Sequence, residues 1–139
     1  MVMCTHCRRR TRVLAAALDP PRCRQCQGPL PWLVDAADDD FPGIADAAPL
    51  PVLVDLWVPT CPHGARVARV VEQMAGELAG RVKVVKVNVE GAPQLSRRFS
   101  VQTSPTLLIL EEGRTVACRC GPDPAYKIRA WVDRALDRE

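Results

Sequence analysis

The chain has 139 residues and a mass of 15.3 kDa, a size that suits one ordinary domain with at most a small appendage. Its hydrophobic content of 47% is enough for a real core and excludes a disordered chain, while the apolar run at residues 13–18 is too short to cross a membrane. The net charge is +3, and because no export signal with a plausible cleavage site is found, we expect a cytoplasmic location.

Two Cys-x-x-Cys pairs stand near the start of the chain, Cys4 with Cys7 and Cys23 with Cys26, and fifteen residues separate them. This spacing is typical of a zinc site in which two knuckles complete a closed tetrahedron of thiolates. We therefore expect residues 1–30 to form a zinc ribbon around a structural Zn²⁺. An iron–sulfur centre and two redox dithiols are the alternatives.

Residues 1–30 also carry six arginines against a single acid, Asp19. Such an asymmetry can indicate a contact with nucleic acid, but this segment has no Phe, Tyr or Trp on which a base would stack. We expect a solvated basic surface and no nucleic-acid partner.

From residue 32 onward the pattern predicts the order β-α-β-α-β-α-β-β-α. Valine-rich runs predict buried strands, and apolar residues at a 3.6-residue period predict helices. The predicted elements are an edge strand at 32–34, a weak and broken helix at 35–48, a strand at 52–57, a helix from Pro62 that stops at Gly80, a strand at 82–89, a short helix at 93–99, a hairpin of strands 106–110 and 115–120, and a last helix that begins at Pro124 with Asp123 as its cap. This order predicts an α/β fold with a central mixed sheet that is covered on both faces.

Cys61 stands where the strand at 52–57 ends and the next helix begins. Unpaired N–H groups and the positive end of a helix dipole stabilise a thiolate at such a place, and the imidazole of His63 can add positive charge. Cys61 is therefore predicted to be a reactive nucleophile. A buried and inert cysteine in a strand-to-helix corner is the alternative.

Several motifs together resemble the thioredoxin family. The central strand ends in Asp-x-Trp-x-Pro at 55–59, Cys61 begins the next helix, Ser-Pro-Thr follows at 104–106, and Gly121 comes after the final strand. With a four-cysteine ribbon in front, the chain is similar to the bacterial zinc-containing thioredoxin 2 group. The resemblance implies a thioredoxin fold over residues 31–139, preceded by the ribbon.

The resemblance also implies roles for the residues that match. Cys61 falls on the nucleophile that forms a mixed disulfide, Asp55 on a buried carboxylate that shuttles a proton, and Lys86 on the lysine near it. The alternative for Asp55 is a surface aspartate at a strand end. Trp57 would pack under the active-site loop, and Pro105 matches a proline with a cis peptide bond that faces the cysteine.

The substrate groove is expected to include three further residues, Pro62, Ser104 and Gly121, while His63 is expected to be one of the catalytic residues. Ser104 stands where the family usually has a bulky apolar residue, which makes that patch of the groove more polar. Gly121 has no side chain, so the opposite wall of the groove stays shallow. Pro62 and His63 resemble the Cys-Pro-His-Cys motif of strongly oxidising relatives, in which the histidine favours the thiolate.

The active-site motif departs from the family at Gly64, which occupies the position of the second, resolving cysteine. This motif has no second thiol for an ordinary dithiol cycle, so a mixed disulfide at Cys61 persists until a thiol from elsewhere attacks it. Cys118 and Cys120 lie two apart on the last strand and point to one face. We hypothesise that Cys120, next to Gly121, is a displaced resolving thiol. The alternative is that both are small apolar strand residues, since a bridge needs Cα atoms within about 7 Å.

The sequence therefore predicts a thiol–disulfide oxidoreductase of thioredoxin type that acts through Cys61. Its expected partners are protein disulfides or mixed disulfides, with a reductase or a low-molecular-weight thiol as the electron donor. Two alternatives remain: a redox-inactive protein-binding module, and a zinc or redox sensor in which oxidation of the ribbon thiols releases the metal.

Overall fold

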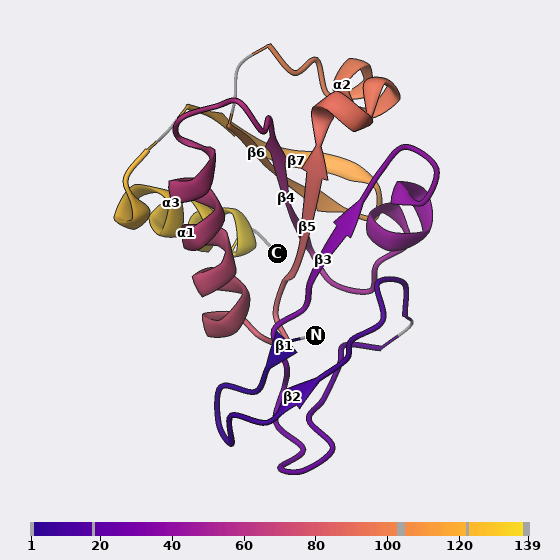
Figure 1. Ribbon diagram of the computed structural model, residues 1–139, viewed down its shortest axis with the longest axis vertical. Coiled ribbons are helices and arrows are strands. Elements are labelled where there is room, and N and C mark those ends of the chain that lie inside the picture. Colours follow the sequence, from indigo (N-terminus) through magenta and orange to yellow (C-terminus); the bar gives the residue numbers. More distant parts are fainter. Residues whose placement is uncertain (1, 18, 103–104, 122, 138–139) are drawn as a thin grey trace.

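A five-stranded mixed sheet forms the centre of the molecule, with the strand order β3-β5-β4-β6-β7 (Figure 1). The computed structural model describes residues 2–17, 19–102, 105–121 and 123–137. Strands β3 (Leu33–Ala36), β5 (Lys83–Asn88) and β4 (Val52–Trp57) are parallel. Strand β6 (Thr106–Glu111) runs antiparallel to β4 and forms a hairpin with β7 (Arg114–Cys120).

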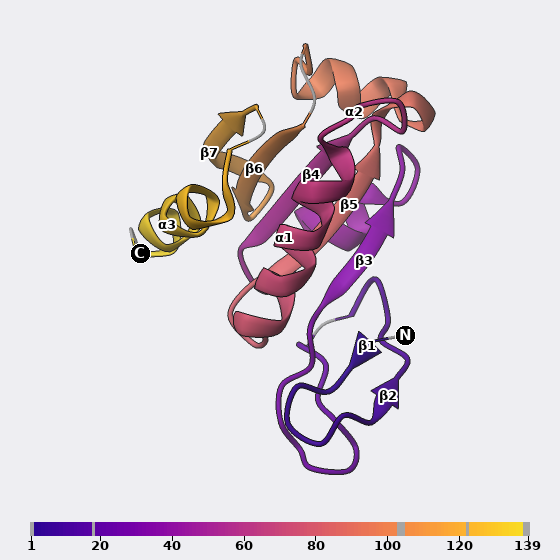
Figure 2. The ribbon, with the colours of Figure 1, turned by 60° about the vertical axis from the view of Figure 1, so that its left-hand side comes forward.

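Helices cover both faces of this sheet (Figure 2). On one face lie α1 (Gly64–Glu77) and α3 (Ala125–Leu136), which pack against inward side chains such as Leu53. On the other face lie the π-helical turn η1 (Pro42–Asp46) and α2 (Pro93–Arg98), joined to β5 by the short 3₁₀ turn η2 (Val89–Gly91). Successive residues of a strand point to opposite faces, so β4 contributes to both halves of the core.

The predicted order of strands and helices is confirmed from β4 onward, and β3 lies at 33–36 instead of 32–34. The weak helix predicted at 35–48 is wrong except for η1. Acidic side chains in this stretch bind backbone N–H groups instead of allowing a helix. The carboxylate of Asp38 accepts from the N–H groups of Gln94 and Leu95 at 3.0 and 2.9 Å, so it caps α2 from outside.

Two helix starts also differ from the prediction. Helix α1 begins at Gly64, and Pro62 and His63 form the turn before it. Asp123 does not cap α3, because its carboxylate pairs with Arg119 at 2.6 Å and Pro124 stands at the cap position. No helix within the described ranges is long and apolar enough to cross a membrane.

Residues 2–17 and 19–30 form a small lobe below the sheet, with a hairpin of β1 (Val2–Met3) and β2 (Arg10–Thr11). A β-bridge between Arg22 and Pro29 closes its second half. The lobe contacts the C-terminal half of α1, where a Cβ atom on Gly76 would lie 3.4 Å from Cγ2 of Thr5.

Lys83 ties the segment between the two cysteine pairs to the sheet. Its ammonium group is fully buried, donates to the carbonyl oxygen of Ile44 at 2.6 Å and to that of Ala15, and lies 4.1 Å from the centroid of the Trp32 ring. Burial lowers the pKa of Lys83 to about 8. The indole N–H of Trp32 donates to the carbonyl oxygen of Leu14 at 2.9 Å, so both side chains fasten the same segment.

Candidate active site

Cys61 lies in a tight turn between β4 and α1. Pro59 cannot donate to a strand ladder, so the chain leaves the sheet after Trp57. The N–H of Cys61 donates to the carbonyl oxygen of Val58 at 3.1 Å, and the N–H of Gly64 donates to the carbonyl oxygen of Cys61 at 3.2 Å. Cys61 is half-buried at the N-terminal end of α1, as the sequence predicted, while Pro62 and His63 are exposed.

Two cavities border Cys61. One, of about 270 Å³, lies on the α1 side, and its walls include Trp57, Gly64, Ala68 and Lys86. The other, of about 390 Å³, lies on the α2 side, and residues 89, 96, 101 and 102 line it together with Cys61. No second cysteine is among the described residues that line either cavity.

Asp55 is buried in the middle of β4, with 1% of its surface exposed, so the alternative of a surface aspartate is wrong. Among the described residues neither of its carboxyl oxygens has a hydrogen-bond partner. Burial raises the pKa of Asp55 to about 6, Lys86 opposes that rise, and Glu72 adds to it. The carboxyl group can therefore take up and release a proton near neutral pH.

Lys86 is paired with Asp55 in register across β4 and β5, as the family resemblance implied. Its ammonium nitrogen lies 3.6 Å from Oε1 of Glu72 on α1. Trp57 follows Asp55 by two residues and points to the same face of the sheet. Its indole N–H is buried and has no hydrogen-bond partner in the described part of the chain.

The segments that precede β6 and follow β7 meet at one end of the sheet. Pro105 is buried, and its carbonyl oxygen accepts a hydrogen bond from the N–H of Gly121 at 3.0 Å. Gly121 has a φ of +99°, a left-handed conformation that favours glycine. Ser104 lies outside the described residues. The structure thus brings Pro105 and Gly121 together, and the groove that they would form beside Cys61 stays a prediction.

Cys120 lies on the opposite face of the sheet from Asp55. It is paired in register with Thr106, which is paired with Leu56 of β4, and residues paired in register share a face. The hydroxyl of Thr106 contacts Sγ of Cys120 at 3.9 Å. Two strand spacings, about 10 Å, separate Cys120 from β4, so the role of Cys120 as a second thiol stays a prediction.

The four cysteines of the N-terminal lobe converge as the spacing predicted. The sulfur atoms of Cys4, Cys7, Cys23 and Cys26 all lie within 4.8 Å of one another, and the pairs Cys4–Cys26 and Cys7–Cys23 are 3.5 Å apart. A tetrahedron with metal–sulfur distances of about 2.3 Å has sulfur atoms roughly 3.8 Å apart. The cluster is therefore positioned to hold one metal ion, and its donor set suits Zn²⁺.

Both knuckles have the same backbone geometry. In the first, the N–H of Cys4 donates to the carbonyl oxygen of Arg9, and Arg8 has a φ of 62°. In the second, the N–H of Cys23 donates to the carbonyl oxygen of Gly28, and the preceding residue 27 has a φ of 66°. Backbone N–H groups that face the sulfur lower the pKa of Cys4 to about 6, which favours the thiolate that binds metal.

Comparison with known proteins gives the family. A sequence model described as Thioredoxin matches residues 33–134. The chain belongs to the thioredoxin family. It is 33% identical over 99 residues to the thioredoxin of Haemophilus influenzae, an alignment that covers 71% of this chain and 92% of that protein. It is 33% identical over 104 residues to thioredoxin C-2 of Corynebacterium nephridii, with 75% and 96% covered. It is 36% identical over 87 residues to thioredoxin 1 of Nostoc sp., with 63% and 81% covered.

The four-cysteine lobe lies outside the thioredoxin match, which begins at residue 33, and far from Cys61. Cys61 lies three residues before Gly64, the first residue of α1, and Thr5 of the lobe lies against Gly76 near the other end of the helix. In Figure 1 the lobe lies at that second end of α1. A 14-residue helix is about 21 Å long. A small molecule at Cys61 therefore cannot touch the four-cysteine cluster at the same time.

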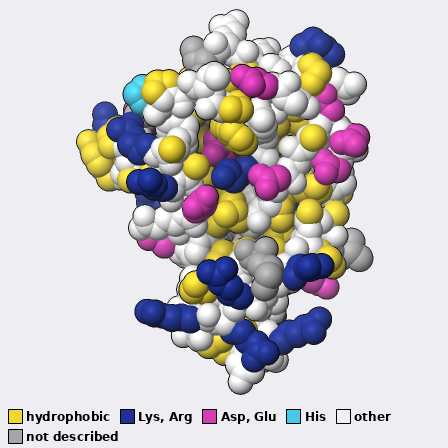
Figure 3. All heavy atoms as spheres, in the orientation of Figure 1, with side chains coloured by type: hydrophobic (Ala, Val, Ile, Leu, Met, Phe, Trp, Pro, Cys, Tyr) yellow, Lys and Arg dark blue, Asp and Glu magenta, His cyan; other side chains and the backbone are white. Residues whose placement is uncertain are grey.

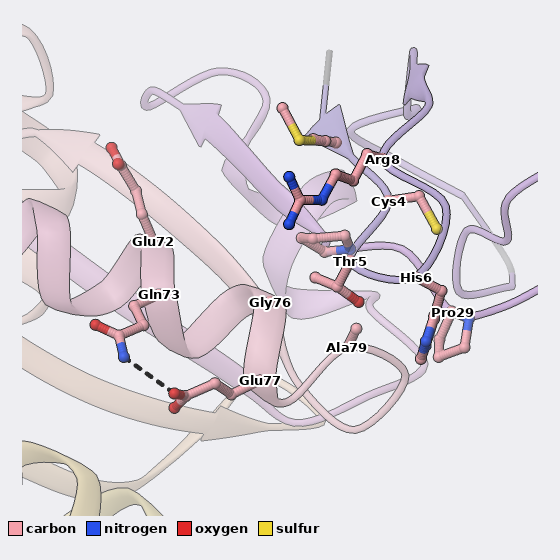
Figure 4. Close-up of a pocket in the computed structure, with 12 residues that line it drawn as sticks. Cys4, Thr5, His6, Arg8, Pro29, Glu72, Gln73, Gly76, Glu77 and Ala79 are labelled. Carbon is pink, nitrogen blue, oxygen red and sulfur yellow. Dashed lines mark hydrogen bonds between the residues drawn. The ribbon is translucent and has the colours of Figure 1, made fainter.

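A cavity of about 710 Å³ separates the first knuckle from α1 (Figure 4). Gln73 and Glu77 of α1 form one wall and are hydrogen-bonded at 3.0 Å, and Arg8 and His6 lie on the side of the lobe. On the face that Figure 3 shows, several basic side chains project from the lobe at the bottom of the view. Its six arginines are all exposed: Arg8, Arg9, Arg10, Arg12, Arg22 and Arg24.

Two residues that matter for this structure are not indicated by the sequence patterns above. Glu72 lies on the exposed face of α1, and nothing in the helical period indicates that it reaches Lys86. Lys83 was read only as part of a valine-rich strand. A lysine inside an otherwise apolar run is the signal that marks it, because a buried charge needs partners.

Proposed function

We propose that this member of the thioredoxin family is a thiol–disulfide oxidoreductase that acts through the single thiol of Cys61. Its substrates are protein disulfides or mixed disulfides, and a low-molecular-weight thiol or a reductase supplies the electrons. The supporting observation is Gly64, which begins α1 where a resolving cysteine would stand. Within the described ranges the cavities around Cys61 offer no replacement thiol.

The exchange takes two steps when the substrate is a protein joined to a small thiol. The Cys61 thiolate attacks the sulfur of the small thiol, the disulfide bond breaks, and the protein sulfur leaves as a thiolate. A second small thiol then attacks the new mixed disulfide, which releases the Cys61 thiolate and a small-molecule disulfide. The second small thiol is oxidised to the disulfide level as the protein sulfur is reduced to a thiol, so the number of disulfide bonds stays the same.

The neighbouring residues support this chemistry. Asp55 provides a proton to a leaving thiolate and accepts one from an incoming thiol, aided by Lys86. His63 adds positive charge beside Cys61 when its imidazole is protonated, at the N-terminal end of α1. Pro105 and Gly121 hold an extended substrate segment in the groove through backbone contacts, together with Trp57, Pro62 and Ser104. Cys120 is the one candidate for an internal second thiol.

We also propose that residues 1–30 are a separate zinc ribbon, that residues 31–139 are the thioredoxin domain, and that the protein acts in the cytoplasm as one of the zinc-containing thioredoxin 2 group. Cys4, Cys7, Cys23 and Cys26 would hold Zn²⁺ in a closed site. Such an ion supplies folding energy to a lobe that has only Leu30 as a fully buried aliphatic residue among those described.

A turnover assay tests the proposal. The substrate is a peptide that carries a glutathione mixed disulfide, with glutathione as the second thiol. We expect Cys61→Ser to abolish the exchange and Cys118→Ser, a matched control on an exposed cysteine of β7, to preserve it. Equal rates for the wild type and Cys61→Ser would refute the proposal.

The same assay separates the second candidate, a redox-inactive protein-binding module. Gly64 favours that candidate, because a thioredoxin without a resolving thiol retains its groove and can still bind extended segments. Under that function, Cys61→Ser changes neither exchange nor the affinity for a bound peptide.

A further inference from the structure

Three charged residues stand in one row across the sheet. Asp35 of β3 is paired in register with Lys86 of β5, and Lys86 is paired with Asp55 of β4. Residues paired in register point to the same face, which here is the face covered by α1. Asp35 is exposed, Lys86 is half-buried and Asp55 is buried, so the row runs from solvent into the core.

Glu72 of α1 forms an ion pair with Lys86, the lysine in this row. The ammonium nitrogen of Lys86 lies 3.6 Å from Oε1 of Glu72, whereas neither oxygen of Asp55 has a hydrogen-bond partner within the described chain. The side chain of Lys86 is 20% exposed and that of Glu72 is 51% exposed, so the ion pair lies at the protein surface. The cation nearest to the buried carboxyl is therefore directed outward.

We propose that Glu72 is a positioning residue that holds the ammonium group of Lys86 at the rim of the cavity beside Cys61 and away from the carboxyl group of Asp55. Lys86 lines that cavity together with Cys61. When Glu72 is removed, the Lys86 side chain is released and pairs with Asp55, its neighbour in register.

The effect on Asp55 follows from the charges that face it. These are Lys86 from β5 and Glu72 from α1, while β6 presents the apolar Leu107 and β4 itself presents the neutral Trp57. Burial raises the pKa of Asp55 to about 6, and the charge of Glu72 contributes to that rise. Loss of Glu72 removes one negative charge and brings a positive charge closer, and both changes favour the carboxylate.

The catalytic meaning of this arrangement rests on the proposed function. A carboxyl group that titrates near neutral pH can pass protons to and from exchanging thiols, whereas one held ionised by a lysine cannot donate them. Glu72 thus sets the pH range in which the carboxyl group of Asp55 can transfer protons during thiol exchange at Cys61.

Titration of Asp55 by carbonyl ¹³C NMR tests the inference without any activity measurement. We expect Glu72→Gln to lower the midpoint of the Asp55 titration by about 0.5 pH or more. Glu72→Asp keeps the charge and should retain most of the wild-type midpoint. The matched control is Glu77→Gln, because Glu77 is on the same helix but pairs with Arg129. That variant should leave the midpoint in place.

An unchanged or raised midpoint in Glu72→Gln overturns the inference, and so does an equal shift in Glu77→Gln. The pH–rate profile of mixed-disulfide exchange gives the second readout, and its Asp55-dependent inflection, identified by its absence in Asp55→Asn, should move with the NMR midpoint. If the midpoint moves but Cys61→Ser exchanges as fast as the wild type, the proposed function fails while the positioning role of Glu72 holds.

Discussion

The N–H of Gly64 donates to the carbonyl oxygen of Cys61 at 3.2 Å, which places the first residue of α1 one tight turn after the candidate nucleophile. A Cβ atom built on Gly64 would meet only the carbonyl oxygen of Val58, at 3.7 Å, an ordinary contact. Glycine is therefore not required at this position by space or backbone conformation. A cysteine side chain fits where a dithiol enzyme would have one.

Gly64→Cys should consequently convert the protein into a dithiol reductase. Because an intramolecular thiol attacks the mixed disulfide at a high effective concentration, we expect insulin reduction with dithiothreitol to rise roughly tenfold or more over the wild type. Gly64→Ser is the control, as it adds a similar volume without a thiol. A folded Gly64→Cys variant with wild-type turnover would contradict this prediction.

Asp55→Asn should stabilise the protein at neutral pH. The folded-state pKa of Asp55, about 6, is raised above the unfolded value, so the folded state binds the proton more tightly. The stability contributed by the neutral carboxyl is present below about pH 4 and is lost as the pH rises through 6. The free energy of unfolding of Asp55→Asn relative to wild type should therefore be higher at pH 8 than at pH 4 by up to about 3 kcal/mol. Urea denaturation at both pH values measures this, and a difference that does not change with pH contradicts it.

Removal of the metal should unfold the lobe and leave the sheet intact. We expect one zinc per chain in the purified wild type by colorimetric release, and none in Cys4→Ser or Cys23→Ser, whose native thiols are both buried. Far-UV circular dichroism should retain the helical signal of the thioredoxin domain. Full zinc content in either variant would exclude the four-thiolate site.

Lys83→Met tests the connection between the lobe and the sheet. The substitution leaves the carbonyl oxygens of Ala15 and Ile44 without their donor, and each loss costs about 1–3 kcal/mol. We expect a lower free energy of unfolding in urea and faster proteolysis within residues 13–17. Lys127→Met, at an exposed lysine of α3, is the control. Equal free energies of unfolding for the two variants would show that the contacts of Lys83 do not stabilise the protein.

Much of the fold followed from the sequence because its signals are local. The valine-rich runs at 52–57 and 82–89, the period of the helix after Cys61 and the hairpin at 106–120 all matched the elements observed. The stretch at 35–48 did not, because its outcome depends on Asp38 binding the first N–H groups of α2, a contact between segments about sixty residues apart.

The residues of the candidate site likewise differ in whether local sequence signals indicate them. Cys61, Asp55 and Lys86 were identified from motifs, and the pairing of Asp55 with Lys86 follows from strand register. Glu72 was not identified, because its ion pair depends on how α1 lies across β5. The distance between Cys61 and Cys120 likewise depends on strand order, which local patterns do not specify.

The lifetime of the mixed disulfide at Cys61 tests the central claim most directly. The oxidised adduct is prepared with a disulfide peptide, and its decay is followed by intact-protein mass spectrometry at increasing glutathione concentration. We expect an adduct that persists without glutathione and decays at a rate proportional to the glutathione concentration, because no internal thiol resolves it. Rapid decay in the absence of glutathione, lost in Cys120→Ser, would contradict the single-thiol mechanism and establish Cys120 as the resolving residue. Failure to form any adduct would exclude Cys61 as a nucleophile.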